Sequence, residues 1–67
     1  MTAREWITAY ALTLGMAAPD GEVVEMILDL AGAAAHASER TAAPVACWMA
    51  ALSGRSAADA LALAREI

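Results

Sequence analysis

Three side chains near the middle of the sequence could together do chemistry: a carboxylate, an imidazole and a guanidinium at Asp29, His36 and Arg40. An imidazole exchanges a proton near neutral pH, and an arginine holds an anion with a planar set of donors. On a helix, Asp29 would lie two turns before His36 on the same face, and Arg40 one turn after it. The pattern therefore indicates a small polar site for an anion such as a phosphate or an anionic cofactor.

A structural role accounts for the same residues. His36 and Arg40 could satisfy free carbonyl groups at a helix end and link that helix to the next one. In either case we expect these two side chains to lie near each other. A catalytic site also needs a pocket that excludes water, which a chain of 67 residues seldom provides. We favour the structural role and predict no catalytic residue, with Cys47 as a small buried hydrophobe.

The acidic residues near the start of the same segment are Glu22, Glu25 and Asp29. Metal sites in helical bundles draw carboxylates from several helices and use a Glu-x-x-His pattern, which is absent here. We therefore interpret the three carboxylates as a solvated face and predict neither a metal site nor a cofactor.

Charge and hydropathy exclude two classes of partner. The net charge is −4, lysine is absent and the four arginines are dispersed, whereas nucleic acids and anionic membranes require concentrated basic residues. The longest uncharged stretches, residues 6–19 and 41–54, have fourteen residues each, and a membrane-spanning helix needs about 20. The N-terminus lacks the pattern of a signal peptide. With a single cysteine besides, we expect a cytoplasmic protein.

Four amphipathic segments are predicted to be helices, at about residues 2–16, 21–37, 42–53 and 57–66. Each follows a residue that can cap a helix: Thr2, Asp20, Thr41 and Ser56. Thr2 and Glu5 fit a capping box, and Gly15 fits a helix end. The sequence therefore predicts one all-α domain over residues 1–67, a compact bundle of four short helices.

Because alanine buries little area, we expect the large side chains to supply most of the core. The predicted core residues are Trp6, Tyr10, Ile27, Leu30, Trp48, Met49 and Leu61. In the segment 42–53, the inward stripe is expected to include Trp48 and Met49, with Val45 and Leu52, while Cys47 points elsewhere. Leu12 and Leu63 fall outside the stripes of their helices, and Met26 lies at the edge of its own. These three large residues are predicted to be exposed interface residues.

Several short patterns resemble an uncharacterised family of small helical domains from high-GC bacteria. They are Trp6, Leu28-Asp29-Leu30-Ala31, Ala35-His36, Arg40 and Ala42-Ala43-Pro44. The resemblance covers nearly the whole chain, and the spacing of His36, Arg40 and Pro44 is its most specific part. It implies no activity. It does imply an association with molybdenum cofactor guanylyltransferases, either as a separate protein or as an appended domain.

These observations lead to three hypotheses for function. The first is a non-catalytic accessory or protein-interaction module, a companion of molybdenum cofactor maturation or of a molybdenum enzyme. The second is a small anion- or cofactor-binding domain with its polar site at Asp29, His36 and Arg40. The third is a homodimerising structural domain, in which a second copy completes an undersized core.

Overall fold

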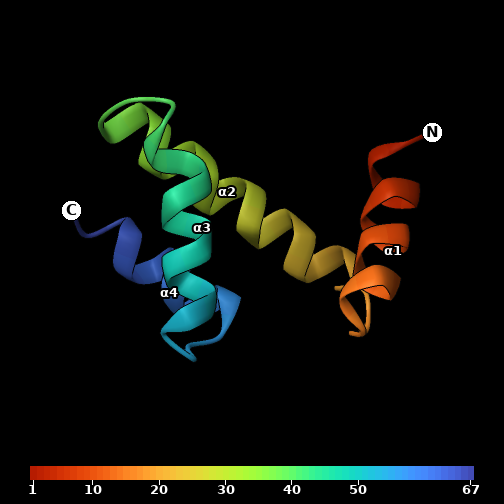
Figure 1. Cartoon of the computed structure of the whole chain (residues 1–67). Coiled ribbons are helices and arrows are strands. Elements are labelled where there is room, and N and C mark those ends of the chain that lie inside the picture. The colour runs from red at the N-terminus through yellow and green to blue at the C-terminus, as the bar shows by residue number, and fades with distance from the viewer.

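The computed structural model describes all 67 residues and contains four α-helices (Figure 1). They are α1 (Ala3–Leu14), α2 (Gly21–Ala37), α3 (Ala42–Leu52) and α4 (Ala57–Ala64). The all-α class and the four predicted helices are confirmed, and each predicted bound lies within two residues of the observed one. None of the helices combines the length and the hydropathy needed to cross a membrane.

The predicted caps form at three of the four helix starts. At α1, the Thr2 hydroxyl accepts the Glu5 N–H at 3.1 Å, and the Glu5 carboxylate accepts the Thr2 N–H at 2.8 Å. The Asp20 carboxylate and the Ser56 hydroxyl cap α2 and α4 in the same way, at 2.9 and 3.1 Å. Gly15 ends α1 in the left-handed conformation, with φ of 75°, which only glycine adopts without strain. Local sequence signals therefore determine where these helices begin and where α1 ends.

Helix α3 begins without the predicted side-chain cap. Thr41 precedes the helix, but its backbone is helical and its side chain makes no capping hydrogen bond. The N–H groups of Ala42 and Ala43 donate to carbonyl oxygens three residues earlier, at 3.0 and 3.2 Å. Pro44, the third residue of α3, has no N–H to satisfy. The donors of the first turn therefore need no hydroxyl cap, and the predicted capping role of Thr41 is wrong.

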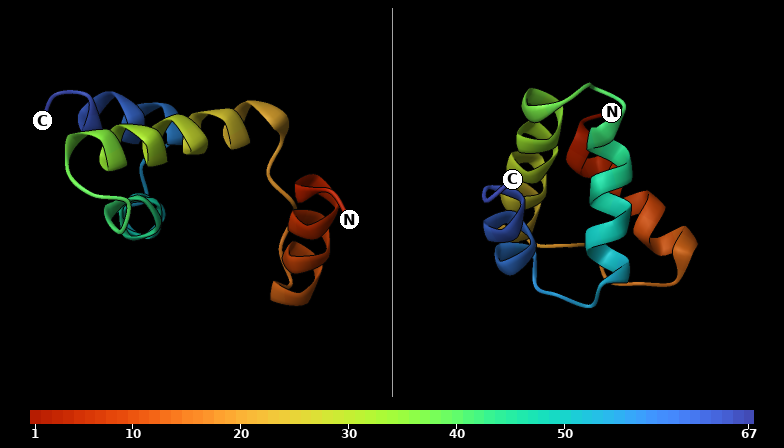
Figure 2. Two further views of the ribbon diagram at one scale, coloured as in Figure 1. Left: turned by 90° about the horizontal axis from the view of Figure 1, so that it is seen from above. Right: turned by 90° about the vertical axis from the view of Figure 1, so that its left-hand side faces the viewer.

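Helices α2, α3 and α4 pack together, with α2 against both of the others (Figure 2). The centre of this unit is Leu30 of α2, which is 3% exposed, with Ala60 and Leu61 of α4. Five partly buried residues pack around this centre: Met26, Ile27, Cys47, Ala50 and Ala64. Helices α3 and α4 lie against each other much less closely than each lies against α2. The core is therefore small and is organised around Leu30.

Helix α1 stands apart from the α2–α3–α4 unit (Figures 1 and 2). Its backbone does not closely approach any other helix, and its side chains meet α2 at the first turns of that helix. Its one buried residue is Ala11. There the Arg4 guanidinium lies over Gly21, 3.1 Å from where a Cβ of that glycine would be. The radius of gyration is 12.2 Å, compared with about 10.9 Å expected for a compact domain of this length. The difference is consistent with the outlying position of α1.

The face of α3 that packs inward is the opposite of the predicted one. Its half-buried residues are all small: Ala42, Ala43, Ala46, Cys47 and Ala50. The Cys47 sulfur lies 3.8 Å from the backbone oxygen of Ile27. Small residues allow two helices to approach closely, so α3 packs on α2 through alanines and turns its large side chains outward. Cys47 was placed outside the inward stripe, which is wrong, but its interpretation as a small hydrophobe packed inside the domain agrees with its contact with the core.

Four of the seven predicted core residues are largely exposed. Trp6 and Tyr10 are 55% and 49% exposed because no other helix lies opposite their side of α1. Trp48 and Met49 are 65% and 59% exposed because α3 is turned the other way. The core prediction is therefore wrong for these four residues. Leu30 and Leu61 are buried, and Ile27 packs against them.

Candidate protein-interaction surfaces

The three residues of the predicted polar site are all exposed. Asp29 and His36 lie on α2, and Arg40 lies in the turn between α2 and α3. The side-chain hydrogen bonds of the chain involve other residues, and the principal surface hollows are lined by other residues. No set of three His, Cys, Asp or Glu side chains is placed to hold a metal ion. The structure does not gather Asp29, His36 and Arg40 into a pocket.

A first apolar surface runs along α1 and consists of Trp6, Tyr10 and Leu14, here called the α1 stripe. These residues are four apart, so they follow one side of the helix. The rings of Trp6 and Tyr10 lie 4.9 Å apart between centroids and are tilted by 31°, a favourable arrangement for two aromatic rings. All three side chains are about half exposed or more. The stripe is a preformed apolar surface with no cover from its own chain.

A second apolar surface lies on the outer side of α3. Its members, here called the α3 outer stripe, are Val45, Trp48, Met49 and Leu52. Their spacing of three and four residues is that of a buried helix face, yet each is more than half exposed. The helix Ala42–Leu52 has no Asp, Glu, Lys, Arg or His. A helix that is apolar on every side is typical of the interior of a larger core. In this chain, however, the outer side of α3 is exposed.

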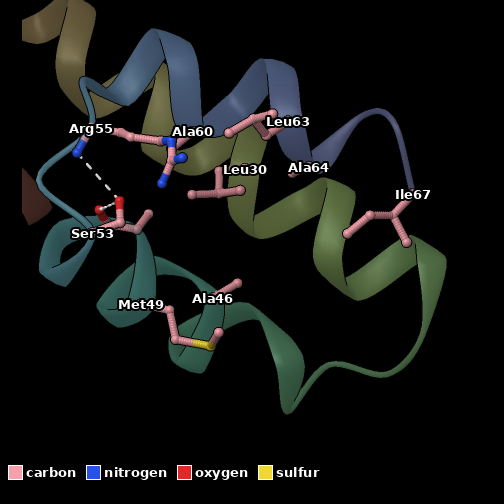
Figure 3. A pocket seen from close by; sticks show the side chains of 10 residues that line it. Leu30, Ala46, Met49, Ser53, Arg55, Ala60, Leu63, Ala64 and Ile67 are labelled. Atoms are coloured by element: carbon pink, nitrogen blue, oxygen red, sulfur yellow. Dashed lines mark hydrogen bonds between the residues drawn. The ribbon is translucent and has the colours of Figure 1, made fainter.

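A groove between α3 and α4 adjoins the second stripe (Figure 3). Leu30 lies between the two helices, with Met49 on the α3 side and Leu63 on the α4 side. The groove has a volume of about 290 Å³ and is lined mainly by apolar side chains. Met49 belongs both to the groove and to the α3 outer stripe, so the two form one continuous apolar surface.

The carboxylates of α1 and α2 are not part of either stripe, whereas the Arg55 side chain lines the α3–α4 groove beside the second one. Glu22, Glu25 and Asp29 are exposed on α2. Glu5 lies on α1, where the Thr2 backbone N–H and then the Thr2 hydroxyl hold the pKa of its carboxyl below the ordinary value. These carboxylates therefore place no charge within either apolar surface.

The three residues predicted as interface candidates lie in different surroundings. Leu12 is 81% exposed but lies about 200° around α1 from Leu14, outside the α1 stripe. Leu63 is exposed and lines the α3–α4 groove. Met26 is partly buried and packs against the core, so it is not the exposed residue that was predicted.

Sequence reasoning missed the main apolar surfaces because it assigned their residues to the core. The available signal was the uncharged stretch of residues 41–54. A helix without charges gives no indication of which side faces solvent. Its largest side chains were therefore assumed to point inward.

The fold and its surfaces define a small all-α domain whose largest side chains face outward. The chain belongs to the family described as a domain of unknown function, DUF6457, whose family model matches residues 1–67. Comparison with curated proteins and with solved structures finds no match. The resemblance to a family of small domains of unknown function is thus confirmed at the level of the family.

Proposed function

We propose that this domain is a non-catalytic protein-interaction module that docks through the α1 stripe and the α3 outer stripe. The observation that carries the proposal is the outer side of α3. Four large apolar side chains are each more than half exposed there, on a helix with no charged residue. Contiguous apolar surfaces of this kind are rare on monomers and are typical of interaction sites.

Two further features support docking as the role of these surfaces. The aromatic side chains of the domain, two tryptophans and one tyrosine, all lie on the two stripes, and aromatic residues dominate the energetics of protein interfaces. The stripes are also built on helices, so their side chains are already arranged before a partner arrives. Preorganisation of this kind reduces the entropy lost on binding.

The sequence resemblance supplies one defined partner to test, a molybdenum cofactor guanylyltransferase. In this proposal the domain would act beside that enzyme in the cytoplasm as an accessory module. The transferase would carry out the chemistry, and the domain would contribute an apolar docking surface.

The test compares two leucines with nearly equal exposure, Leu52 of the α3 outer stripe at 66% and Leu28 of α2 at 65%. Leu52→Arg and Leu28→Arg add the same charge and keep a good helix former. Association is measured by light scattering of the domain alone and by titration against the guanylyltransferase. We expect Leu52→Arg to weaken the observed association at least about tenfold, the loss of one well-packed interface residue. We expect Leu28→Arg to leave it unchanged. Equal association by both variants and the wild type would contradict the proposal.

A further inference from the structure

We propose that the partner of this surface is a second copy of the same chain. The α1 stripe of each protomer lies on the α3 outer stripe of the other, and the two equivalent contacts are related by a two-fold axis. This inference rests on the proposed function, since it names the occupant of the same two surfaces.

The exposed area of the chain supports a dimer of substantial size. Its accessible surface is 5145 Å², whereas a folded monomer of 6.9 kDa exposes about 4,000 Å². The excess is about 1,150 Å² per chain, or about 2,300 Å² for two chains. Homodimers whose subunits are stable only together bury roughly 2,000 to 5,000 Å² in total. The combined excess of two chains therefore lies near the lower end of the total area that such an interface buries.

Within one chain the two stripes do not meet. The connection from α1 to α2 is residues 15–20, which starts with the left-handed Gly15 and ends with the cap Asp20. The Met16 N–H returns to the Ala11 carbonyl at 3.0 Å, and Pro19 restricts its own backbone and that of the preceding residue. This short, restrained connection keeps α1 at the first turns of α2, away from α3. A second chain can bring an α1 stripe to the α3 stripe that the first chain leaves open.

Symmetry favours a second copy over an unrelated protein, and charge at the contact does not oppose it. One chain carries two separate apolar stripes, and a two-fold axis that places α1 on the partner's α3 covers all four stripes of the pair. An unrelated protein would need two apolar surfaces at matching positions. Each chain has a net charge of −4, so two copies repel at long range, an effect that salt screens. The residues of both stripes are uncharged, so the contact adds no repelling pair.

The first arm of the test measures mass by sedimentation equilibrium, with two matched pairs of variants. We expect the wild type to have twice the chain mass of 6.9 kDa. Leu14→Arg and Leu52→Arg, one on each stripe, are expected to give the mass of a single chain. The controls are Leu12→Arg on α1 and Leu28→Arg on α2, both at exposed leucines outside the stripes, and both are expected to remain dimeric. Far-UV circular dichroism of each variant checks that its helices remain.

The second arm tests the pairing of α1 with α3 directly. Leu14→Glu chains and Leu52→Arg chains are each expected to be monomeric alone. When they are mixed, one contact of the heterodimer is unaltered and the other joins the new Glu to the new Arg. Their mixture is therefore expected to dimerise. This arm keeps the inference testable even where a single variant folds poorly alone, since mixing would restore the dimer.

The outcomes separate this inference from the proposed function. A mixture that stays monomeric while the wild type dimerises would overturn the α1–α3 pairing. A monomeric wild type would overturn the second copy as partner, whether α1 closes onto its own chain or another protein covers the stripes. In that case, titration against the guanylyltransferase decides the proposed function. Binding that is weakened by Leu52→Arg but not by Leu28→Arg would support it, and binding that neither variant weakens, or no binding at all, would contradict it.

Discussion

The α2–α3–α4 unit and helix α1 show two ways in which a short sequence can specify a helix. The unit holds its helices by burial around Leu30, which has neighbours from both α3 and α4. Helix α1 is closed at both ends by hydrogen bonds of its own, the Thr2–Glu5 capping box and the Gly15 turn. No other helix packs along it, and Ala11 is its one buried residue. Local signals are therefore enough to define α1, but not to give its apolar side a place to be buried.

The same contrast appears between the two sides of α3. The inner side packs through alanines and Cys47, while the outer side presents Trp48, Met49 and Leu52. Small residues give close approach but little buried area. The large residues, which have the most to gain from burial, are the ones left exposed. The chain therefore has a core of its own but leaves much of its hydrophobic stabilisation to be gained by association.

The largest effect is expected from the centre of the α2–α3–α4 unit. Leu30→Ala removes a buried side chain and should lower the free energy of unfolding by about 2–5 kcal/mol. Denaturant unfolding followed by circular dichroism measures it. Leu28→Ala is the control, because Leu28 is 65% exposed and should change stability by no more than about 0.5 kcal/mol. Similar losses for both variants would mean that burial around Leu30 does not hold the unit together.

Trp48→Ala should have an effect that depends on protein concentration. A buried core tryptophan would cost about 3–5 kcal/mol at any concentration. Because Trp48 is exposed in the single chain, we expect a small effect in dilute protein. At concentrations where the wild type associates, we expect Trp48→Ala to lower the free energy of unfolding by about 2 kcal/mol. Thermal melting over a series of concentrations measures this effect. A large loss of stability that is the same at every concentration would show that Trp48 is a buried core residue.

Thr2→Ala should affect α1 alone. It removes the hydroxyl of the capping box and should cost about 1 kcal/mol of helix stability. In dilute protein, amide hydrogen exchange should become faster in α1 and stay unchanged in α2, α3 and α4, because α1 hardly contacts them. Thr13→Ala is the control, since the Thr13 hydroxyl bonds only to a carbonyl within α1. Faster exchange across the whole chain would show that α1 and the other helices unfold together.

The smallest effect is expected from acid. Hydrogen bonds from Thr2 hold the pKa of the Glu5 carboxyl below its ordinary value. The capping contribution of Glu5 is therefore fully present above the ordinary glutamate pKa and is lost as pH falls through the lowered value. The helical signal of α1 should decrease over that acidic range. Glu5→Gln keeps a neutral acceptor at the same position and should remove this part of the pH dependence. An unchanged acid transition in that variant would contradict the assignment to Glu5.

The sequence predicted the parts of the fold that depend on local chemistry. Asp20, Ser56, Thr2 and Gly15 define helix ends through hydrogen bonds and backbone conformation within a few residues. Trp6 and Trp48 could not be placed in this way, because their burial depends on which helices lie opposite them. Alanine-rich helices accept several packing faces at similar cost, so periodicity alone did not select the inner side of α3.

The candidate sites also show the difference between features that local sequence determines and features that depend on how the helices pack. Asp29, His36 and Arg40 have the right chemistry and spacing for a polar site, but spacing along one helix does not create a concave surface. The excess of apolar residues indicated an interaction surface, and three residues were named for it by their positions outside or at the edge of an assumed core stripe. Of these, Leu63 lines the α3–α4 groove, whereas Leu12 and Met26 lie in neither stripe. Because α3 packs through its small residues, the stripe that was predicted to form the core is the exposed apolar surface.

The central claim is that the α1 stripe and the α3 outer stripe are covered by a second copy. The most direct measurement uses the two tryptophans, one on each stripe, as separate probes in Trp6→Phe and Trp48→Phe chains. Acrylamide quenching of the remaining tryptophan is recorded over a series of protein concentrations. The account predicts that both probes are strongly quenched in dilute protein and become protected together as concentration rises. Strong quenching that does not change with concentration, for either probe, would contradict it.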